Sequence, residues 1–199
     1  MAESDRGLPR LGVGDPMEAL GLEAGEVVLD LGSGPGRDVL FAAEQVGRRG
    51  QAIGVDATPE MVFRAREAAA SLRRTNAEFR LGEIEHLPIE SGTVDAIASD
   101  CVINLSPDKA QVFREAFRVL KPGGRIVVSD VVADRELPSK MQQDTERWAA
   151  CEAGAVTRAE YVALMRRAGF DRIRTERKGA YRAGLSRALV RGVKPHAST

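Results

Sequence analysis

Three glycines at alternate positions follow directly on a short apolar run and an acid. The segment 27–31 reads Val-Val-Leu-Asp-Leu, and Gly32, Gly34 and Gly36 come next in the chain. Glycine permits tight turns and lets the backbone approach a ligand closely. A helical pattern of apolar residues then continues to position 46. The sequence therefore predicts a strand, a glycine turn and a helix, which build a nucleotide-type pocket at the carboxyl end of the first strand of an α/β sheet.

Two acids flank this predicted pocket. Asp30 precedes the first glycine by two residues, so it would place negative charge beside a ligand, which suits an ammonium or a sulfonium. Asp56 ends the second predicted strand, where an acid can hold ribose hydroxyls. The glycine spacing is Gly-x-Gly-x-Gly, unlike the Gly-x-Gly-x-x-Gly that directs a helix N-terminus at a pyrophosphate. A Rossmann-like fold that binds another nucleotide remains the alternative interpretation.

Together with segment 120–124, Leu-Lys-Pro-Gly-Gly, these features resemble the class I S-adenosylmethionine (SAM) methyltransferases. The resemblance implies SAM as cofactor, with the glycine turn around its methionine moiety and Asp56 at its ribose. It also implies that Ala57 and Met61 flank adenine, and that the Ile84 backbone N–H and a neighbouring carboxylate hold the adenine edge. For Glu83 and Glu85 a solvated surface charge is the alternative. The cofactor-binding residues implied in this way are Asp30, Gly32, Ser33, Gly34, Gly36, Asp56, Ala57, Met61, Ile84, Glu85 and Asp100.

The chain has two cysteines, Cys101 and Cys151, and no Cys-x-x-Cys pair. This excludes a disulfide scaffold and the common structural zinc sites, and we predict no bound metal cofactor. Cys101 follows the fourth predicted strand, 94–99, and should lie on the rim of the cofactor pocket because ligands bind outside the carboxyl ends of such strands. A buried, unreactive core cysteine is the alternative interpretation.

The segments around both cysteines are the most specific part of the chain. Residues 99–109 and 150–157 resemble the two cysteine segments of the arsenite methyltransferases, and the likeness extends over roughly residues 25–175. The resemblance implies that Cys101 and Cys151 bind trivalent arsenic as substrate, for arsenic detoxification. Soft ions favour thiolates over oxygen or nitrogen donors. It also implies a thiol reductant such as glutathione or thioredoxin, with a protein disulfide able to form during turnover.

Two features depart from that family pattern. Related arsenite enzymes carry at least one more cysteine ahead of the first strand, and residues 1–29 contain none. Inorganic arsenite prefers three thiolates, whereas a monomethylated arsenical needs only two. We therefore expect an enzyme that prefers methylarsenite or borrows a thiol from glutathione. In addition, Asp100 stands where the family often has asparagine, and its carboxylate could favour the SAM ammonium or face solvent.

Two other functions remain open from the sequence alone. The same fold could methylate a small organic acceptor at carbon, oxygen or nitrogen, as quinone-biosynthesis relatives do, and His86 could then serve as a base. A surface position is the simpler interpretation of His86, and His196 lies in a polar tail. The chain could also be an arsenical-binding or SAM-binding module with little turnover.

Composition limits the remaining choices. The 199 residues suit a single α/β domain spanning 1–199, with residues 1–13 and 195–199 expected to be flexible. The net charge is zero, and eight basic residues at 172–194 read as a solvated hairpin face, so we expect no nucleic-acid partner. No apolar run approaches the ~20 residues that span a bilayer, and no signal-peptide core is present, so we expect no membrane partner and a cytoplasmic location.

The alternation of strands and helices predicts a Rossmann-like doubly wound sheet of about seven strands. The last two strands are joined only by 178–182 and must be antiparallel, so the sheet is mostly parallel and closed by a C-terminal hairpin. The predicted strands are 26–31, 50–55, 78–81, 94–99, 125–131, 172–177 and 183–193. The predicted helices are 16–20, 36–46, 58–73, 106–120, 138–150 and 157–168.

Overall fold

The computed structural model describes residues 14–138, 141, 144, 146–147, 151–182 and 184–196. The segment 1–13 and the end of the C-terminal tail, which the sequence predicts to be flexible, lie outside the described residues. Most of the predicted helix 138–150, including Trp148, also lies outside them.

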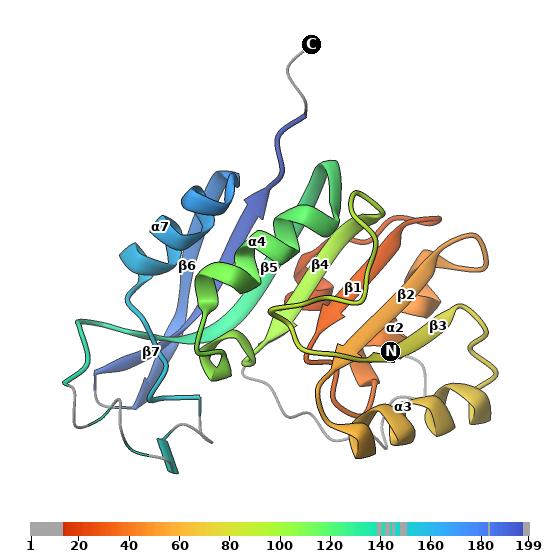
Figure 1. The fold of residues 1–199 in the computed structure, drawn as a ribbon, viewed down its shortest axis with the longest axis horizontal. Coiled ribbons are helices and arrows are strands. Elements are labelled where there is room, and N and C mark those ends of the chain that lie inside the picture. Colours follow the sequence, from red (N-terminus) through yellow and green to blue (C-terminus); the bar gives the residue numbers. More distant parts are fainter. Residues whose placement is uncertain are drawn as a thin grey trace.

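Seven strands form one sheet in the order β3-β2-β1-β4-β5-β7-β6 (Figure 1). All neighbouring pairs from β3 to β5 are parallel, whereas β7 is antiparallel to both β5 and β6. The predicted fold class is therefore confirmed, with β7 the one reversed strand. The strands are β1 (Val27–Leu31), β2 (Gln51–Asp56), β3 (Ala77–Leu81), β4 (Val94–Asp100), β5 (Leu120–Ala133), β6 (Asp171–Arg182) and β7 (Leu185–Val193).

Helices cover both faces of the sheet, because each strand of a parallel sheet buries both of its faces. One buried cluster joins the helices α1, α2 and α3 to one face, and a second joins α4, α7 and the segment 84–89 to the other. α4 and α7 lie side by side on that second face (Figure 1). The helices are α1 (Pro16–Ala19), α2 (Arg37–Val46), α3 (Pro59–Ser71), the 3-10 turn η2 (Ile103–Leu105), α4 (Lys109–Val119) and α7 (Arg158–Ala168).

Two predicted boundaries are wrong. The stretch 178–182, predicted as the hairpin connection, belongs to β6, and the strand changes register near Gly179 (φ 123°). A glycine in a basic stretch resembles a turn, but bulges accommodate it within a strand. Likewise β5 starts at Leu120, directly after α4, and 121–124 occupy a register shift between the pairs Val94–Leu120 and Ala96–Arg125.

Part of the predicted solvated basic face has a structural role. Lys194 Nζ donates to the carbonyl oxygens of Phe117 and Leu120, both at 2.7 Å, at the C-terminus of α4. Arg191 donates to the carbonyl oxygen of Ala19 at the end of α1. Both side chains therefore hold the hairpin against helices, while the other six basic residues of 172–194 are exposed. In the part of the chain that the structure describes, no helix is long and apolar enough to cross a membrane.

Candidate active site

The glycine turn packs against the first cysteine segment at the carboxyl ends of β1 and β4. Gly32 has a φ of 70°, and a Cβ added there would lie 2.5 Å from Val102 Cγ2, in the residue after Cys101. Gly36 has a φ of 91°, and a Cβ there would lie 2.6 Å from the Phe79 ring. Both positions therefore need glycine for backbone conformation and for space. The turn and Cys101 segment form one wall of the site.

Asp56 holds the glycine turn from the neighbouring strand. Its Oδ2 accepts from the Gly34 N–H at 2.8 Å, and its Oδ1 accepts from the Thr58 N–H at 2.9 Å. Two backbone donors at the mouth of the turn are thus satisfied by one carboxylate. Asp56 lies where the sequence predicts it, at the end of β2, with its oxygens directed at backbone donors.

Negative charge accumulates around Asp30. This side chain is 5% exposed, and its pKa is raised well above the usual range, first by burial and then by repulsion from Asp38, Asp100 and Asp56. Asp30 is buried and the other three carboxyl groups are half-buried, and a buried carboxylate is costly unless it is paired with a cation. The residues fit a ligand that carries positive charge better than they fit a pyrophosphate. Two buried hydroxyls, Ser33 Oγ and Ser99 Oγ, have no hydrogen-bond partner among the described residues.

The other predicted cofactor residues lie around this edge of the sheet and differ in exposure and in hydrogen bonding. Ala57 is exposed and Met61 half-buried, while the Ile84 side chain is 9% exposed and belongs to the core. Glu85 accepts a short hydrogen bond from Ser106 Oγ, so its carboxylate already has a partner. A hollow of 600 Å³ beside it is lined by Glu83, Glu85, His86, Pro107, Asp108 and Gln111. Asp100 accepts from the Gly14 N–H, at 3.2 Å to Oδ1 and 3.4 Å to Oδ2.

The two cysteines, far apart in the sequence, meet in the fold. Cys151 Sγ donates to the Cys101 carbonyl oxygen at 2.8 Å, and both thiols are free. Cys101 is half-buried and Cys151 is 8% exposed. Both residues have left-handed backbone, with φ of 58° and 60°, which is uncommon outside glycine. The fold therefore brings the two cysteine segments together.

The two thiols titrate as a coupled pair. Each is in hydrogen-bond reach of the other, and this contact lowers the pKa of Cys151 and raises that of Cys101. Burial raises the pKa of Cys101 further, as do the carboxylates of Asp130 and Asp100. These shifts make Cys151 the more acidic thiol of the pair, and in the structure it carries the proton that it donates to the Cys101 carbonyl oxygen.

A buried polar network joins the two cysteine segments, and the sequence reasoning missed it. The two N–H groups of Asn104 Nδ2 are shared among three acceptors: Asp130 Oδ1 (2.8 Å), the Val131 carbonyl oxygen (2.6 Å) and the Cys151 carbonyl oxygen (3.1 Å). Tyr161 donates to Asp130 Oδ2 at 3.0 Å. The available signals were polar residues at positions where neighbours are apolar: Asn104 inside the first cysteine segment, and Asp130 inside a predicted buried strand.

The residue after Cys151 anchors that segment to the hairpin. The Glu152 side chain is fully buried and pairs with Arg182 of β6 at 2.6 Å and with Arg147 at 3.3 Å. Buried charges persist in proteins when they are paired. The Cys151 segment is thus attached on one side to Asn104 and on the other to the sheet edge.

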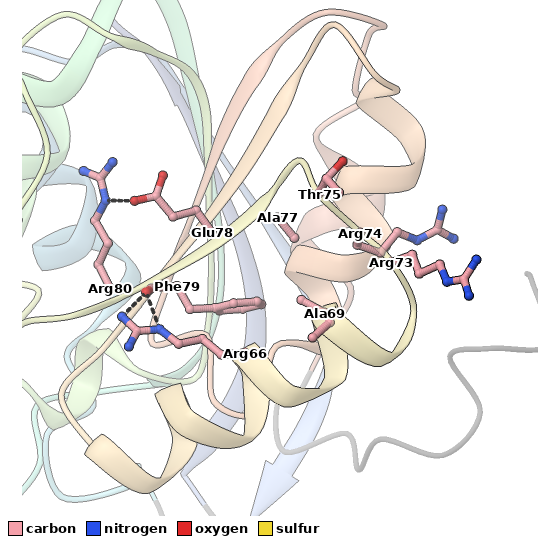
Figure 2. Close-up of a pocket in the computed structure, with 10 residues that line it drawn as sticks. Arg66, Ala69, Arg73, Arg74, Thr75, Ala77, Glu78, Phe79 and Arg80 are labelled. Atoms are coloured by element: carbon pink, nitrogen blue, oxygen red, sulfur yellow. Dashed lines mark hydrogen bonds and ion pairs between the residues drawn. The ribbon is translucent and has the colours of Figure 1, made fainter.

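A second hollow, of 690 Å³, lies away from this edge between α3 and β3 (Figure 2). It is lined by four arginines, but three of them already have partners. Arg66 donates to the Phe79 carbonyl oxygen, Arg80 pairs with Glu78, and Arg74 pairs with Glu44. The chemistry-bearing residues named above do not line it, so the glycine turn and the cysteines remain the candidate active site.

Comparison with known proteins agrees with this geometry. A family described as a methyltransferase domain matches residues 22–169. An arsenite methyltransferase of Halobacterium salinarum is 47% identical over 163 residues, which cover 82% of this chain and 42% of that protein. An arsenite methyltransferase of Aquipseudomonas alcaligenes is 45% identical over 150 residues, 72% of this chain and 43% of that protein. The chain thus spans less than half the length of these curated relatives.

A solved structure shows the same fold. The crystal structure of an arsenic (III) S-adenosylmethionine methyltransferase from Chlamydomonas reinhardtii superposes with a TM-score of 0.79 at 33% identity, covering 96% of this chain and 72% of that one. The glycine turn, the acid-rich pocket and the paired cysteines lie within the matched region. The chain belongs to the arsenic (III) S-adenosylmethionine methyltransferases, a family of class I methyltransferases.

Proposed function

We propose that this protein transfers a methyl group from SAM to trivalent arsenic held by Cys101 and Cys151, and that it prefers methylarsenite. The observation that carries the proposal is the pairing of two free thiols, 50 residues apart in the sequence, beside the glycine turn. The family membership supports the reaction class. The arsenic ligands and the preferred substrate rest on the cysteines of this chain.

The residues around the turn fit SAM. We assign Gly32, Ser33, Gly34 and Gly36 to its methionine moiety, with Asp30 and Asp100 offering negative charge to its ammonium and sulfonium. Asp56 would hold the ribose, Ala57 and Met61 would flank adenine, and Ile84 and Glu85 would meet the adenine edge. The cofactor supplies a methyl group on a positively charged sulfur. The three half-buried carboxyl groups around the buried Asp30 support a cationic ligand.

The thiol pair suits the capture of a trivalent arsenical. Methylarsenite has one methyl group and two hydroxyls on arsenic. Each thiol displaces one hydroxyl group from arsenic, and its proton leaves with that hydroxyl as water. Both As–S bonds form at the cost of two As–O bonds, with no change of oxidation state.

Methyl transfer then requires position more than acid–base chemistry. SAM would supply the methyl group and leave as S-adenosylhomocysteine, while Cys101 and Cys151 would hold the arsenic so that its lone pair faces the methyl carbon. Holding the two atoms in line supplies much of the rate, and no general base is required. The sequence supplies two thiols, which satisfy methylarsenite, whereas arsenite would need a third sulfur from glutathione. A thiol reductant such as glutathione or thioredoxin would return arsenic to the trivalent state.

The test is methyl transfer from labelled SAM to arsenite and to methylarsenite, with and without glutathione. The wild type is compared with Cys101→Ser and Cys151→Ser, and SAM binding is measured on each variant as the control. We expect either substitution to lower turnover by about 10²-fold or more, because chelation by two linked ligands is lost. SAM affinity should change little.

Three outcomes would contradict parts of the proposal. Equal turnover of both arsenicals without added thiol would refute the preference for methylarsenite. Binding of arsenicals and SAM without methyl transfer would indicate a binding module. If SAM binds but arsenicals are neither bound nor methylated, the substrate would have to be sought among organic acceptors.

A further inference from the structure

Asn104 is the side chain that contacts both sides of the thiol pair. It lies on η2, three residues after Cys101, and is fully buried. Its amide nitrogen reaches the Cys151 carbonyl oxygen at 3.1 Å and the Val131 carbonyl oxygen at 2.6 Å. No other side chain in the described part of the chain is recorded as donating to the Cys151 backbone. Two contacts therefore join the cysteine segments: the Cys151 thiol itself, which meets the Cys101 carbonyl oxygen, and the Asn104 amide, which holds the Cys151 backbone.

The backbone at both cysteines is strained, and strain of this kind persists only where surrounding contacts impose it. Among the described residues, four that are not glycine have positive φ, and Cys101 and Cys151 are two of them. The Cys101 N–H is held by the Ser129 carbonyl oxygen at 2.8 Å. The Cys151 carbonyl is held by Asn104. Each left-handed cysteine thus has its own hydrogen bond that resists relaxation.

Asp130 and Val131 fix the orientation of the Asn104 amide. Asp130 Oδ1 accepts from Asn104 Nδ2 at 2.8 Å and from the Val131 N–H at 2.9 Å. The other carboxylate oxygen accepts from Tyr161 on α7 at 3.0 Å. All three side chains, Asn104, Asp130 and Tyr161, are fully buried. The Asn104 arm of this network reaches the cysteines, whereas the Tyr161 arm fastens a helix to the sheet.

We propose that Asn104 is a positioning residue that sets the separation of the two thiols, so that one trivalent arsenical is chelated by both. It acts through the Cys151 backbone and does not contact the arsenical. Without the amide, the Cys151 carbonyl oxygen loses the hydrogen bond that opposes relaxation of its left-handed backbone, and the second thiol is held less firmly opposite Cys101 while Glu152 still anchors the segment to the sheet edge. Each thiol keeps its own reactivity, but the advantage of a preformed pair disappears. This inference rests on the proposed function of Cys101 and Cys151 as arsenic ligands.

The experiment uses phenylarsine oxide, a trivalent arsenical that takes two thiols, on the full chain. Its affinity is measured for wild type, Asn104→Ala, Tyr161→Phe and Cys151→Ser, alongside the alkylation rate of the thiols by iodoacetamide and the melting temperature. Tyr161→Phe is the matched control, because it removes a buried hydrogen bond to the same carboxylate on the arm that does not reach the cysteines. Asn104→Ser, which keeps one donor, carries the same expectation if Asn104→Ala does not fold.

We expect Asn104→Ala to bind phenylarsine oxide about 10- to 10²-fold more weakly than the wild type, approaching Cys151→Ser, since the gain from linking two ligands is of this order or more. Tyr161→Phe should bind within about threefold of wild type, even where its melting temperature falls equally. In turnover, Asn104→Ala should raise the KM for methylarsenite and leave the KM for SAM unchanged. Iodoacetamide should alkylate the thiols of Asn104→Ala at least as fast as those of the wild type.

The outcomes separate the two proposals. If Asn104→Ala binds phenylarsine oxide as tightly as the wild type, or if Tyr161→Phe loses as much affinity, Asn104 has only a structural role and the positioning proposal fails. If the wild type binds no more tightly than Cys151→Ser, the two-thiol function itself fails, and the positioning proposal fails with it.

Discussion

Replacing Asp130 with asparagine should change how the stability of this protein depends on pH. Asp130 is fully buried, and its pKa is raised from 3.8 to about 7. Burial is the main cause, and repulsion from Asp100 adds to it. The hydrogen bonds from Tyr161 and the Val131 N–H, and the charge of Lys109, oppose it. The neighbouring thiol of Cys101 also interacts with this carboxylate.

The sign follows from where the proton is bound. Between pH 3.8 and about 7 the folded protein keeps the Asp130 proton and the unfolded chain releases it. The free energy of unfolding therefore falls as pH rises through this window. At about 1.36 kcal/mol per pKa unit, the total loss is about 4 kcal/mol, of which about 3 kcal/mol falls between pH 5 and pH 8. Asparagine has no proton to lose, and it can accept from Asn104 and donate to the Tyr161 oxygen.

The assay is urea unfolding of wild type and Asp130→Asn at pH 5, 6, 7 and 8. We expect the free energy of unfolding of the variant, minus that of the wild type, to increase by about 3 kcal/mol from pH 5 to pH 8. This increase does not depend on how the two stabilities differ at pH 5. The raised pKa of Asp30 acts on both proteins and cancels in the difference. Parallel pH curves for the two proteins would refute a pKa near 7 for Asp130.

Three further predictions follow from contacts around the site. Gly32→Ala should weaken binding of both SAM and arsenicals, because its Cβ would meet Val102 at 2.5 Å. Adding Val102→Ala to this variant should restore part of the lost affinity, measured by isothermal titration. No restoration would show that the positive φ alone is responsible. Arg182→Ala should lower the free energy of unfolding by about 1–2 kcal/mol, below the usual cost of breaking a buried pair because Arg182 is 65% exposed. Lys178→Ala, which breaks an exposed pair on the same strand, should cost under about 0.5 kcal/mol, and equal losses in denaturant unfolding would contradict the role of Glu152. Asp56→Ala should weaken SAM binding about tenfold or more, because the Gly34 and Thr58 N–H groups lose their acceptor; unchanged affinity would show that the turn holds its shape without this carboxylate.

The local elements of this fold were predictable because their signals lie within a few residues of one another. Asp108 accepts from the Gln111 N–H at the start of α4, and Thr157 and Glu160 form a capping box at the start of α7. The strand, glycine turn and helix of 27–46 follow from an apolar run, three glycines and a helical period. The boundary of β6 was not predictable in this way, because a strand that contains bulges is defined by its partner rather than by its own alternation.

The sequence by itself determined which residues make up the candidate site: a glycine turn, the acids at the ends of β1 and β2, and two cysteines in recognisable segments. Only the tertiary structure decided that the thiols meet, that both cysteines have left-handed backbone, and that one buried amide links their segments. The Asn104–Asp130 and Tyr161–Asp130 contacts span 26 and 31 residues. Such long-range contacts leave no periodic signal, because each forms only after the sheet has brought its strands together. The residues that could bind arsenic can therefore be predicted from the sequence, whereas their geometry is set by the tertiary structure.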